Sequence, residues 1–383
     1  MNVVVIGAGI VGAALADRLA ATGARITVVD AAAPGRGTSA MSLAWLNANA
    51  TLDPGYFGFR VAAMRAWAEL AAEFGEPPWY VPTGNLVWTR TDETREELAG
   101  RVDRLRDRDY PARLVTAAEA AAIEPGLRAP PTGALAAHFP AEGYVHGAEV
   151  VQVLLGRAQR AGARLIAGSR VTGLEVGGGR VTGVRLSTGQ RLAADAVVCA
   201  AGWRANALLA TLDAELPLAD VYEPGSPAPG VIVTVAAPGS SPRGIVHAPA
   251  VHVRAAWPDG LLMLPGDGGT AIDMFTTEAE LIAQAADLLG HAAQILVGLG
   301  GARITAAWRC VRPLPADGYP LVGWHRPGLY VAVTHSGITL APYLARLITE
   351  ELLAGADAPE LASYRPDRPV AGPEVGVAQG GRA

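Results

Sequence analysis

The sequence of 383 residues predicts a mixed α/β fold, in which a parallel sheet is accompanied by a separate antiparallel sheet. A strand, a glycine-rich turn, a helix and a second strand follow one another over residues 3–30, which is the pattern of a parallel βαβ unit. Short strands that alternate with turns fill residues 221–275, and this pattern is typical of antiparallel sheets. Apolar strands return near the C-terminus, at residues 304–312 and 329–333.

The opening unit carries the clearest local signal. Residues 3–6 form a continuous apolar, β-prone run, as expected of a strand that is buried on both faces. Residues 13–22 have the composition of a helix, and residues 25–30 form a second strand with Asp30 at its end.

The turn inside this unit has the spacing of a dinucleotide-binding loop. Gly7 permits a tight turn, Gly9 lets the backbone approach a pyrophosphate, and Gly12 allows close packing of helix on strand. The helix N-terminus meets the phosphate charge, while Asp30 binds the ribose hydroxyls and repels a 2′-phosphate, which disfavours NADP. The predicted nucleotide site contains these four residues together with Ala8, Ile10, Val11 and Ala31. A glycine-rich turn without a ligand is the alternative, and the spacing does not separate FAD from NAD.

The rest of the chain alternates helices with short strands. After a turn-rich stretch, we expect helices at residues 57–74, 93–108, 148–161, 278–299 and 341–353. We expect further strands at residues 84–88, 163–166, 171–176, 181–186 and 196–200. Residues 128–143 are expected to form a loop, and the residues after Pro366 a tail.

Composition excludes several classes of protein. Half of the residues are hydrophobic and 17% are charged, which excludes wholesale disorder. The net charge of −5 provides no positive field for a phosphate backbone, so no nucleic-acid partner is expected. The chain contains no lysine, which excludes a pyridoxal-phosphate Schiff base, a Walker-type phosphate loop and a lysine nucleophile.

The cysteines and the apolar runs indicate whether disulfides, a metal site or a membrane span are expected. Cys199 and Cys310 are too few for a disulfide framework, and no Cys/His cluster has zinc spacing, so no metal is expected. The N-terminus lacks the pattern of a signal peptide, and every apolar run is interrupted before it reaches the length of a membrane span. We expect a cytoplasmic protein without a transmembrane segment.

Dispersed segments resemble the D-amino-acid oxidase, glycine oxidase and sarcosine oxidase superfamily of FAD-dependent enzymes. They occur in family order at residues 3–30, 37–49, 162–176, 194–206, 310–323 and 329–352. The first segment is shared by many dinucleotide enzymes, whereas the last two, CVRPLPADGYPLVG and LYVAVTHSGITLAPYLARLITEEL, are more specific. The resemblance identifies a superfamily and not a substrate, and it implies FAD as the cofactor.

The resemblance implies a Rossmann-like, discontinuous FAD-binding domain with an inserted substrate domain that is built on an antiparallel sheet. The implied FAD-binding domain comprises residues 1–80, 143–212 and 306–365. The implied substrate domain comprises residues 81–142 and 213–305, and residues 366–383 form a flexible tail.

The resemblance also implies further contacts with the flavin cofactor. A Ser/Thr-rich loop near the pyrophosphate is matched by Thr38, Ser39 and Ser42, and Val171 matches a residue whose backbone faces the adenine. A small-residue turn after a strand is matched by Ala201 and Gly202, and a loop beside the flavin ring by Gly337, Ile338 and Thr339. Each has a structural alternative; Ser39, for example, can cap a helix.

Arg312 lies at the end of the strand expected at residues 304–312. Because the side chains of a strand alternate, Trp308, Cys310 and Arg312 share one face. A guanidinium at the end of a buried strand suits a carboxylate, which its planar fork binds in a bidentate way. Arg312 also matches the arginine that grips the substrate carboxylate in glycine and D-amino-acid oxidases. The alternative is an internal salt bridge to an acid such as Asp317.

His335 and Cys310 complete the expected site. His335 lies where glycine oxidase carries a second arginine. We expect this histidine to line the substrate pocket, to orient the amine or to tune the charge of the flavin. The alternative is a histidine that is hydrogen-bonded to a nearby backbone group. Cys310 occupies the position of the cysteine that sarcosine oxidase bonds to its flavin. A covalent thioether and a buried cysteine that acts as a small hydrophobe are both open.

The resemblance implies oxidation of the C–N bond of an amine or amino acid, of the glycine, sarcosine or D-amino-acid type. Hydride passes from the neutral amine to flavin N5 and leaves an imine, while the protein positions and desolvates the substrate. Oxygen or a quinone or other carrier takes the electrons, although the lysine with which sarcosine oxidases activate oxygen is missing. Alternatives are a flavin monooxygenase, another FAD or NAD oxidoreductase, and a dinucleotide-binding protein without turnover.

Overall fold

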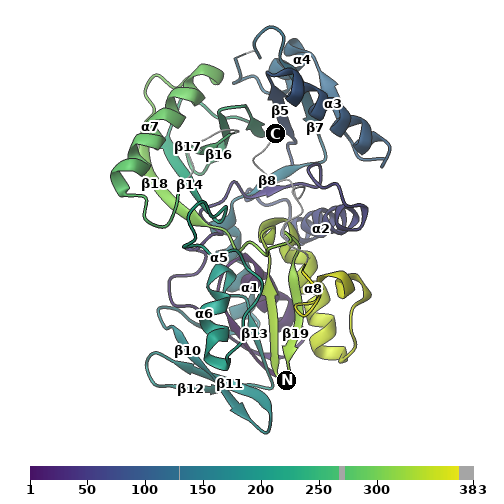
Figure 1. Ribbon diagram of the computed structural model, residues 1–383, viewed down its shortest axis with the longest axis vertical. Coiled ribbons are helices and arrows are strands. Elements are labelled where there is room, and N and C mark those ends of the chain that lie inside the picture. Colours follow the sequence, from purple (N-terminus) through teal and green to yellow (C-terminus); the bar gives the residue numbers. More distant parts are fainter. Residues whose placement is uncertain (129, 267–271, 371–383) are drawn as a thin grey trace.

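Two large sheets divide the chain into a lower and an upper body (Figure 1). The computed structural model describes residues 1–128, 130–266 and 272–370. Within these residues the lower body is built on a six-stranded, mainly parallel sheet and the upper body on an eight-stranded, mainly antiparallel sheet. The expected combination of a Rossmann-like domain with an antiparallel-sheet domain is thereby confirmed.

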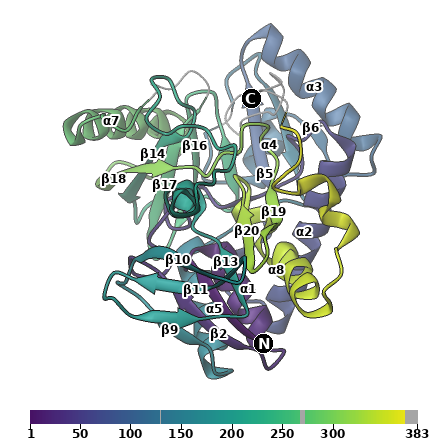
Figure 2. The same cartoon turned by 60° about the horizontal axis from the view of Figure 1, so that its bottom comes forward.

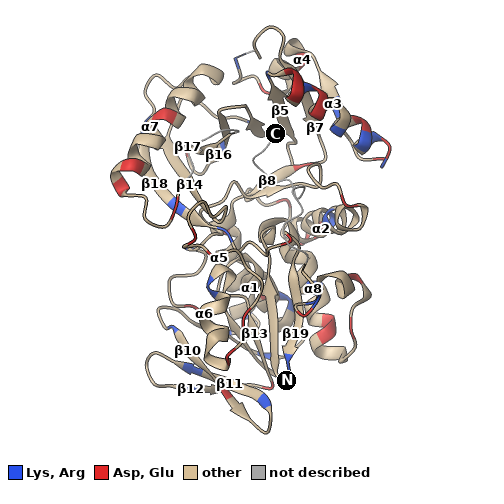
Figure 3. Cartoon of the chain, viewed as in Figure 1, with Lys and Arg blue, Asp and Glu red and all other residues tan. Residues whose placement is uncertain are grey.

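The six-stranded sheet is centred on the first strand of the chain. Its strands, in spatial order, are β19 (Leu321–Arg326), β20 (Leu329–Val333), β13 (Ala196–Cys199), β1 (Asn2–Ile6), β2 (Arg25–Val29) and β9 (Arg164–Ile166). Neighbouring strands are parallel except β19, which is antiparallel to β20. The strands β1, β13 and β20 hold no charged residue, as expected of strands covered on both faces (Figure 3).

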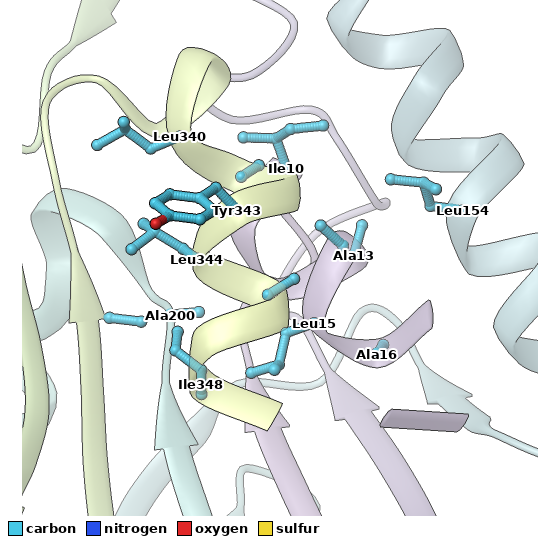
Figure 4. Packing of buried hydrophobic residues seen from close by; sticks show 14 of the residues in the cluster. Ile10, Ala13, Leu15, Ala16, Leu154, Ala200, Leu340, Tyr343, Leu344 and Ile348 are labelled. Atoms are coloured by element: carbon cyan, nitrogen blue, oxygen red, sulfur yellow. The ribbon is translucent and has the colours of Figure 1, made fainter. Parts of the chain in front are cut away.

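Helices cover one face of this sheet. They are α1 (Ile10–Ala20), α5 (Gly147–Arg160) and α8 (Gly337–Ala354), and α2 (Pro54–Glu73) packs on α8. Ile10 and Leu15 of α1 and Leu344 and Ile348 of α8 belong to one buried cluster (Figure 4). The other face carries α6 (Ala205–Leu209) and a small sheet of β10 (Val171–Gly177), β11 (Arg180–Leu186) and β12 (Arg191–Ala193), which Figure 2 shows from a second direction.

The eight-stranded sheet forms the centre of the upper body. Its strands, in spatial order, are β18 (Arg303–Val311), β14 (Pro229–Ala236), β17 (Gly260–Pro265), β16 (Val251–Ala256), β15 (Ile245–His247), β5 (Asn85–Thr89), β7 (Leu135–Phe139) and β6 (Arg113–Val115). Helix α7 (Glu278–Ile295) covers the outer face, where Val233 and Leu288 are buried together. On the inner face, Ile232 and Cys310 pack against Leu43, which belongs to the loop after β2. The inner face is therefore turned toward the lower body.

Shorter elements join and flank the two bodies. A sheet of β3 (Trp45–Leu46), β8 (Gly143–Val145) and β4 (Tyr80–Val81) lies between them (Figure 1). Helices α3 (Asp92–Arg106) and α4 (Ala117–Ile123) flank the upper sheet, and α3 carries charges of both signs (Figure 3). None of the helices in the described part of the chain combines the length and the apolar character that crossing a membrane requires.

Several expected segments differ from the structure in their bounds or type. The expected loop at residues 128–143 contains β7, because residues 135–139 find partners in both β5 and β6. The expected helix at 278–299 ends at Ile295, because Leu296 takes an extended backbone with φ −113° and ψ 147°. The expected helix at 13–22 begins earlier, at Ile10, with Gly9 at its N-cap.

Helix α8 begins at Gly337, four residues before the expected start at 341. Pro342 in its interior has no N–H to donate to the carbonyl oxygen of Ile338. The indole Nε1 of Trp67, on α2, donates to that oxygen at 2.9 Å and replaces the missing donor. The helix therefore continues on the N-terminal side of the proline, and Gly337, Ile338 and Thr339 form its first turn instead of the expected loop.

The strand β18 crosses the expected boundary between the two domains. The expected boundary at residue 306 falls inside this strand, which pairs with β14 of the eight-stranded sheet along its length. We therefore propose that the substrate domain extends to Val311. In the expected tail, Arg368 forms an ion pair with Asp317 at 2.7 Å, so this residue is anchored. Residues 371–383 of the expected tail lie outside the described residues.

Candidate functional site

The glycine-rich loop after β1 has the geometry that its spacing predicts. Gly7 has a φ of 106°, and a Cβ at Gly12 would overlap the carbonyl oxygen of Gly7. A Cβ at Gly7 would in turn overlap the carbonyl oxygen of Ala200, at the end of β13. The absence of these side chains lets α1 begin directly above the sheet, so that its N-terminus is open to an anionic group.

Asp30 lies against this loop. Its Oδ2 accepts a hydrogen bond from the Ala8 N–H at 2.7 Å, and its Oδ1 accepts one from the Ala32 N–H at 2.8 Å. A carboxylate has about four acceptor positions, so both oxygens retain capacity for ribose hydroxyls. Ala31, between these residues, is exposed. Asp30 therefore also orders the loop, a role that its spacing does not predict.

The three hydroxyls of the expected Ser/Thr-rich loop have different partners. Ser39 Oγ accepts from the Ile10 N–H at 2.9 Å and so caps the start of α1, which is the structural alternative considered for it. Thr38 Oγ1 donates to the Val311 carbonyl at 2.7 Å, and Ser42 Oγ accepts from the Ala44 N–H at 3.0 Å. Ser39 therefore lies beside the glycine loop, whereas Thr38 connects the Ser/Thr-rich loop to the end of β18.

The remaining expected cofactor residues surround the same loop. Val171 begins β10, just after Ser169, whose N–H donates to the Asp30 carbonyl at 3.0 Å. Ala201 follows the carbonyl that Gly7 approaches, and Gly202 has a φ of 58°. At the other end of the site, a Cβ on Gly337 would lie 3.4 Å from Val11 Cγ2. The N-termini of α8 and α1 therefore converge, and both helix dipoles favour negative charge between them.

Arg312 follows directly after β18 and is oriented by backbone carbonyls. Its Nε donates to the Ala228 carbonyl at 3.4 Å, and its Nη2 donates to the Pro227 carbonyl. The alternative of a salt bridge to Asp317 is wrong, because that carboxylate is paired with Arg368. Within the described residues Arg312 has no ion-pair partner, so its positive charge is available to a ligand.

His335 lies beside Arg312 at the turn before α8. Burial, together with the positive charges of Arg312 and Arg60, lowers the pKa of His335 to about 3, so that the imidazole is neutral at pH 7. Among the described residues its side chain has no hydrogen-bond partner, which contradicts the alternative of a histidine bonded to nearby backbone. The positive charge of Arg312 therefore acts on His335, the second of the two expected catalytic residues.

The environment of β18 differs in part from the expected buried strand. Trp308 is 51% exposed, because β18 is the edge of its sheet and its middle faces solvent. Cys310, in contrast, is buried with Ile232 and Leu262, and burial raises the pKa of its thiol to about 12. The thiol is therefore protonated at pH 7, as in a cysteine that acts as a small hydrophobe.

Two buried polar residues near this site were not predicted. Arg60, on α2, binds Asn47 and Ser336, and Glu142 accepts hydrogen bonds from Tyr110 OH at 2.7 Å and from Trp45 Nε1 at 3.0 Å. A sequence signal exists for Arg60, since it lies four and three residues from Tyr56 and Ala63 on the apolar face of its helix. Glu142 lies in a segment expected to be a loop and has no comparable signal.

Comparison with known proteins assigns this arrangement to a family. A family described as FAD dependent oxidoreductase matches residues 2–351. The chain belongs to this family. Glycine oxidase of Geobacillus kaustophilus is 27% identical over 392 residues, covering 98% of each chain. D-amino acid dehydrogenase of Cereibacter sphaeroides is 30% identical over 433 residues, covering 95% of this chain and 94% of the relative.

Solved structures agree with this family assignment. The crystal structure of glycine oxidase from Geobacillus kaustophilus has a TM-score of 0.81 at 25% identity and covers 96% of this chain and 99% of that one. The expected superfamily and its cofactor, FAD, are confirmed. This chain is thus an FAD-dependent oxidoreductase of the class that oxidises amines or amino acids.

The residues of the site fit FAD. The close approaches at Gly7 and Gly12 and the converging N-termini of α1 and α8 form a cradle for an extended anionic ligand. In this FAD-dependent oxidoreductase the backbone of the glycine loop would hold the pyrophosphate, and Asp30 the ribose. The first turn of α8 and the turn at Gly202 would adjoin the flavin ring.

Proposed function

We propose that this flavoenzyme oxidises the C–N bond of an amino acid, or of another amine that carries a carboxylate. Arg312 binds the carboxylate, His335 lines the pocket beside the amine, and FAD, when bound, accepts the hydride. The observation that carries this proposal is the guanidinium of Arg312, which is without a carboxylate partner among the described residues and lies beside the neutral His335.

The surroundings of Arg312 support a ligand that is an anion. Two backbone carbonyls orient its guanidinium and leave Nη1 without a protein partner in the described part of the chain. Burial lowers the pKa of Arg312, but a guanidinium remains charged at pH 7. A desolvated cation without a counter-ion is costly, so a carboxylate that pairs with it gains both charge and hydrogen bonds.

The charges around His335 support oxidation of a neutral amine. Arg312 and Arg60 both act on this position, and His335 itself adds no charge. Two nearby positive charges disfavour an ammonium group, so a substrate amine loses its proton more easily here than in water. Hydride loss requires this deprotonated form, and the neutral imidazole is left to orient it.

The electron acceptor that we propose is a quinone or another carrier, with oxygen as the slower alternative. The whole chain contains no lysine, so the activation of oxygen by a lysine cannot operate here.

An anaerobic substrate panel tests the proposed reaction. Purified holoenzyme is mixed with three pairs, namely glycine and methylamine, sarcosine and dimethylamine, and D-alanine and ethylamine, and the loss of flavin absorbance is followed. We expect bleaching by at least one carboxylated member to be about 10- to 100-fold faster than by its partner, because a charge-assisted pair contributes roughly 1.5–3 kcal/mol. Equal rates within every pair, or bleaching by NADPH alone, would overturn the proposal. Reoxidation by oxygen and by a soluble quinone is then compared.

A further inference from the structure

We propose that Arg60 is a positioning residue of this reaction site, which joins the loop after β3 to the start of α8 through its buried guanidinium. The inference rests on the proposed function, because His335 lies in the turn that leads into α8. It concerns a residue on a third element, α2, that does not belong to the nucleotide loop or to β18.

The guanidinium of Arg60 uses its fork on two separate segments. Its Nε donates to the Asn47 carbonyl and its Nη2 to Asn47 Oδ1, both at 2.8 Å. Its Nη1 donates to Ser336 Oγ at 2.6 Å. A bidentate grip on one residue and a third bond to another require a planar, five-donor group, which the ammonium of a lysine does not provide.

The bond from Arg60 diverts Ser336 from its usual role. Ser336 is the N-cap of α8, yet its side chain makes no capping hydrogen bond to the helix. An N-cap serine stabilises its helix when its hydroxyl accepts from the first turn. Here the hydroxyl accepts from Arg60 instead. The start of α8 therefore lacks the stabilisation of a serine cap, and Ser336, the residue next to His335, is linked to α2 instead.

Arg60 is a buried charge without a carboxylate partner in the described part of the chain. The residue is 7% exposed, and the partners of its side chain are a carbonyl, an amide and two hydroxyls. A buried cation of this kind lowers the stability of the fold, so neutral groups would form a purely structural link with a smaller loss of stability. Its charge and that of Arg312 both lower the pKa of His335. The pair favours negative charge at the site, both on a bound carboxylate and on a reduced flavin.

A second bond from α2 fixes the same helix start. Trp67 lies seven residues after Arg60, and its indole donates to the Ile338 carbonyl at 2.9 Å and to the Thr339 carbonyl at 3.1 Å. Helix α2 therefore holds the first turn of α8 at two points. Only the contact made by Arg60 brings a charge.

Three variants and one matched control test this role. Arg60→Met removes charge and fork, Arg60→Lys keeps the charge alone, and Ser336→Ala removes one bond. Arg65→Met makes the same chemical change on an exposed residue of the same helix. The measurements are kcat and KM for the best substrate of the panel, and the midpoint potential of the bound flavin.

We expect Arg60→Met to lower kcat by about 10- to 100-fold with a much smaller change in KM, because misplacing the helix start affects the reacting geometry. The same variant should lower the flavin potential, since a nearby positive charge favours the reduced form. Arg60→Lys should restore the potential but not kcat, and Ser336→Ala should lower kcat alone. Arg65→Met should match the wild type in both.

Wild-type kcat and potential in Arg60→Met would overturn the inference. So would equal loss in Arg60→Met and Arg60→Lys without any difference in potential, which would mark a merely structural contact. If Arg60→Met does not fold, the kcat and the flavin potential of Arg60→Lys and Ser336→Ala test the inference instead. A wild type that no amine bleaches would overturn the proposed function, whereas the potentials would still decide whether the charge of Arg60 reaches the flavin.

Discussion

Arg368 pairs with Asp317 at 2.7 Å, and this ion pair removes the acid nearest to Arg312 in the sequence. The guanidinium holds both carboxylate oxygens, through Nη2 to Oδ1 at 2.9 Å and through Nε to Oδ2 at 3.0 Å. Asp317 also accepts from the Tyr319 N–H at 3.0 Å. A carboxylate that is bound in this way has little capacity left for Arg312, which therefore meets the site with its charge unpaired.

Replacing Arg312 should separate recognition of the carboxylate from binding of the flavin. We expect Arg312→Met to raise KM for carboxylated amines by about 10- to 100-fold, which corresponds to the loss of a charge-assisted pair. KM for the decarboxylated partner should change little, and flavin content should match the wild type. Arg303→Met, which changes an exposed residue at the start of β18, is the control. An unchanged KM for the carboxylated member would remove Arg312 from this role.

His335 should make the stability of the protein depend on pH. Its pKa is about 3 in the folded state, below its usual value of 6.5, so the unfolded chain binds more protons between these values. Stability from the neutral imidazole is therefore complete above pH 6.5 and is lost as the pH falls through this window. Urea unfolding of His335→Gln should show a smaller loss of stability between pH 7 and pH 5 than the wild type. Parallel losses in the two proteins would contradict a depressed pKa.

Cys310 should leave the flavin unattached. Its buried, protonated thiol is a poor nucleophile, so we expect acid precipitation to release all of the flavin into the supernatant. Cys310→Ser should release the same fraction. A yellow pellet that appears in the wild type and disappears in Cys310→Ser would show a covalent thioether.

The bond from Trp67 to α8 should contribute measurably to stability. Trp67→Phe leaves the Ile338 carbonyl without the donor that replaces Pro342, and we expect a loss of about 1–3 kcal/mol in the free energy of unfolding. Trp88 is equally buried, but its Nε1 has no hydrogen-bond partner among the residues that the structure describes. Trp88→Phe therefore removes packing without removing a bond and is the matched control. A loss as large in the control would assign the effect to packing.

Much of the lower body could be predicted because its signals are local. The βαβ opening rests on three periodic segments and on glycines at Gly7 and Gly12, where no side chain fits. Arg312 was singled out because it ends an apolar strand and also matches the carboxylate-binding arginine of the family. His335 was singled out by the position that it shares with a second arginine of glycine oxidase.

Other features depend on residues that are distant in the sequence. The strands β3 and β4 have two residues each and exist because β8 lies between them. The first turn of α8 persists because Trp67 supplies a donor, which residues 337–341 do not reveal. Glu142 accepts from Trp45, which is nearly one hundred residues away, and no local pattern marks that bond.

The order of residues along the chain was enough to predict the nucleotide loop, because strand alternation and glycine geometry act over a few neighbouring positions. The cofactor class and the proposed reactive side chains were indicated by the resemblance to a known family. The fold alone settled which charges remain unpaired. Asp317 forms an ion pair with Arg368, and Arg60 donates a hydrogen bond to Ser336. The pairing of charges depends on distance in space, and that distance is known only after the two bodies have packed.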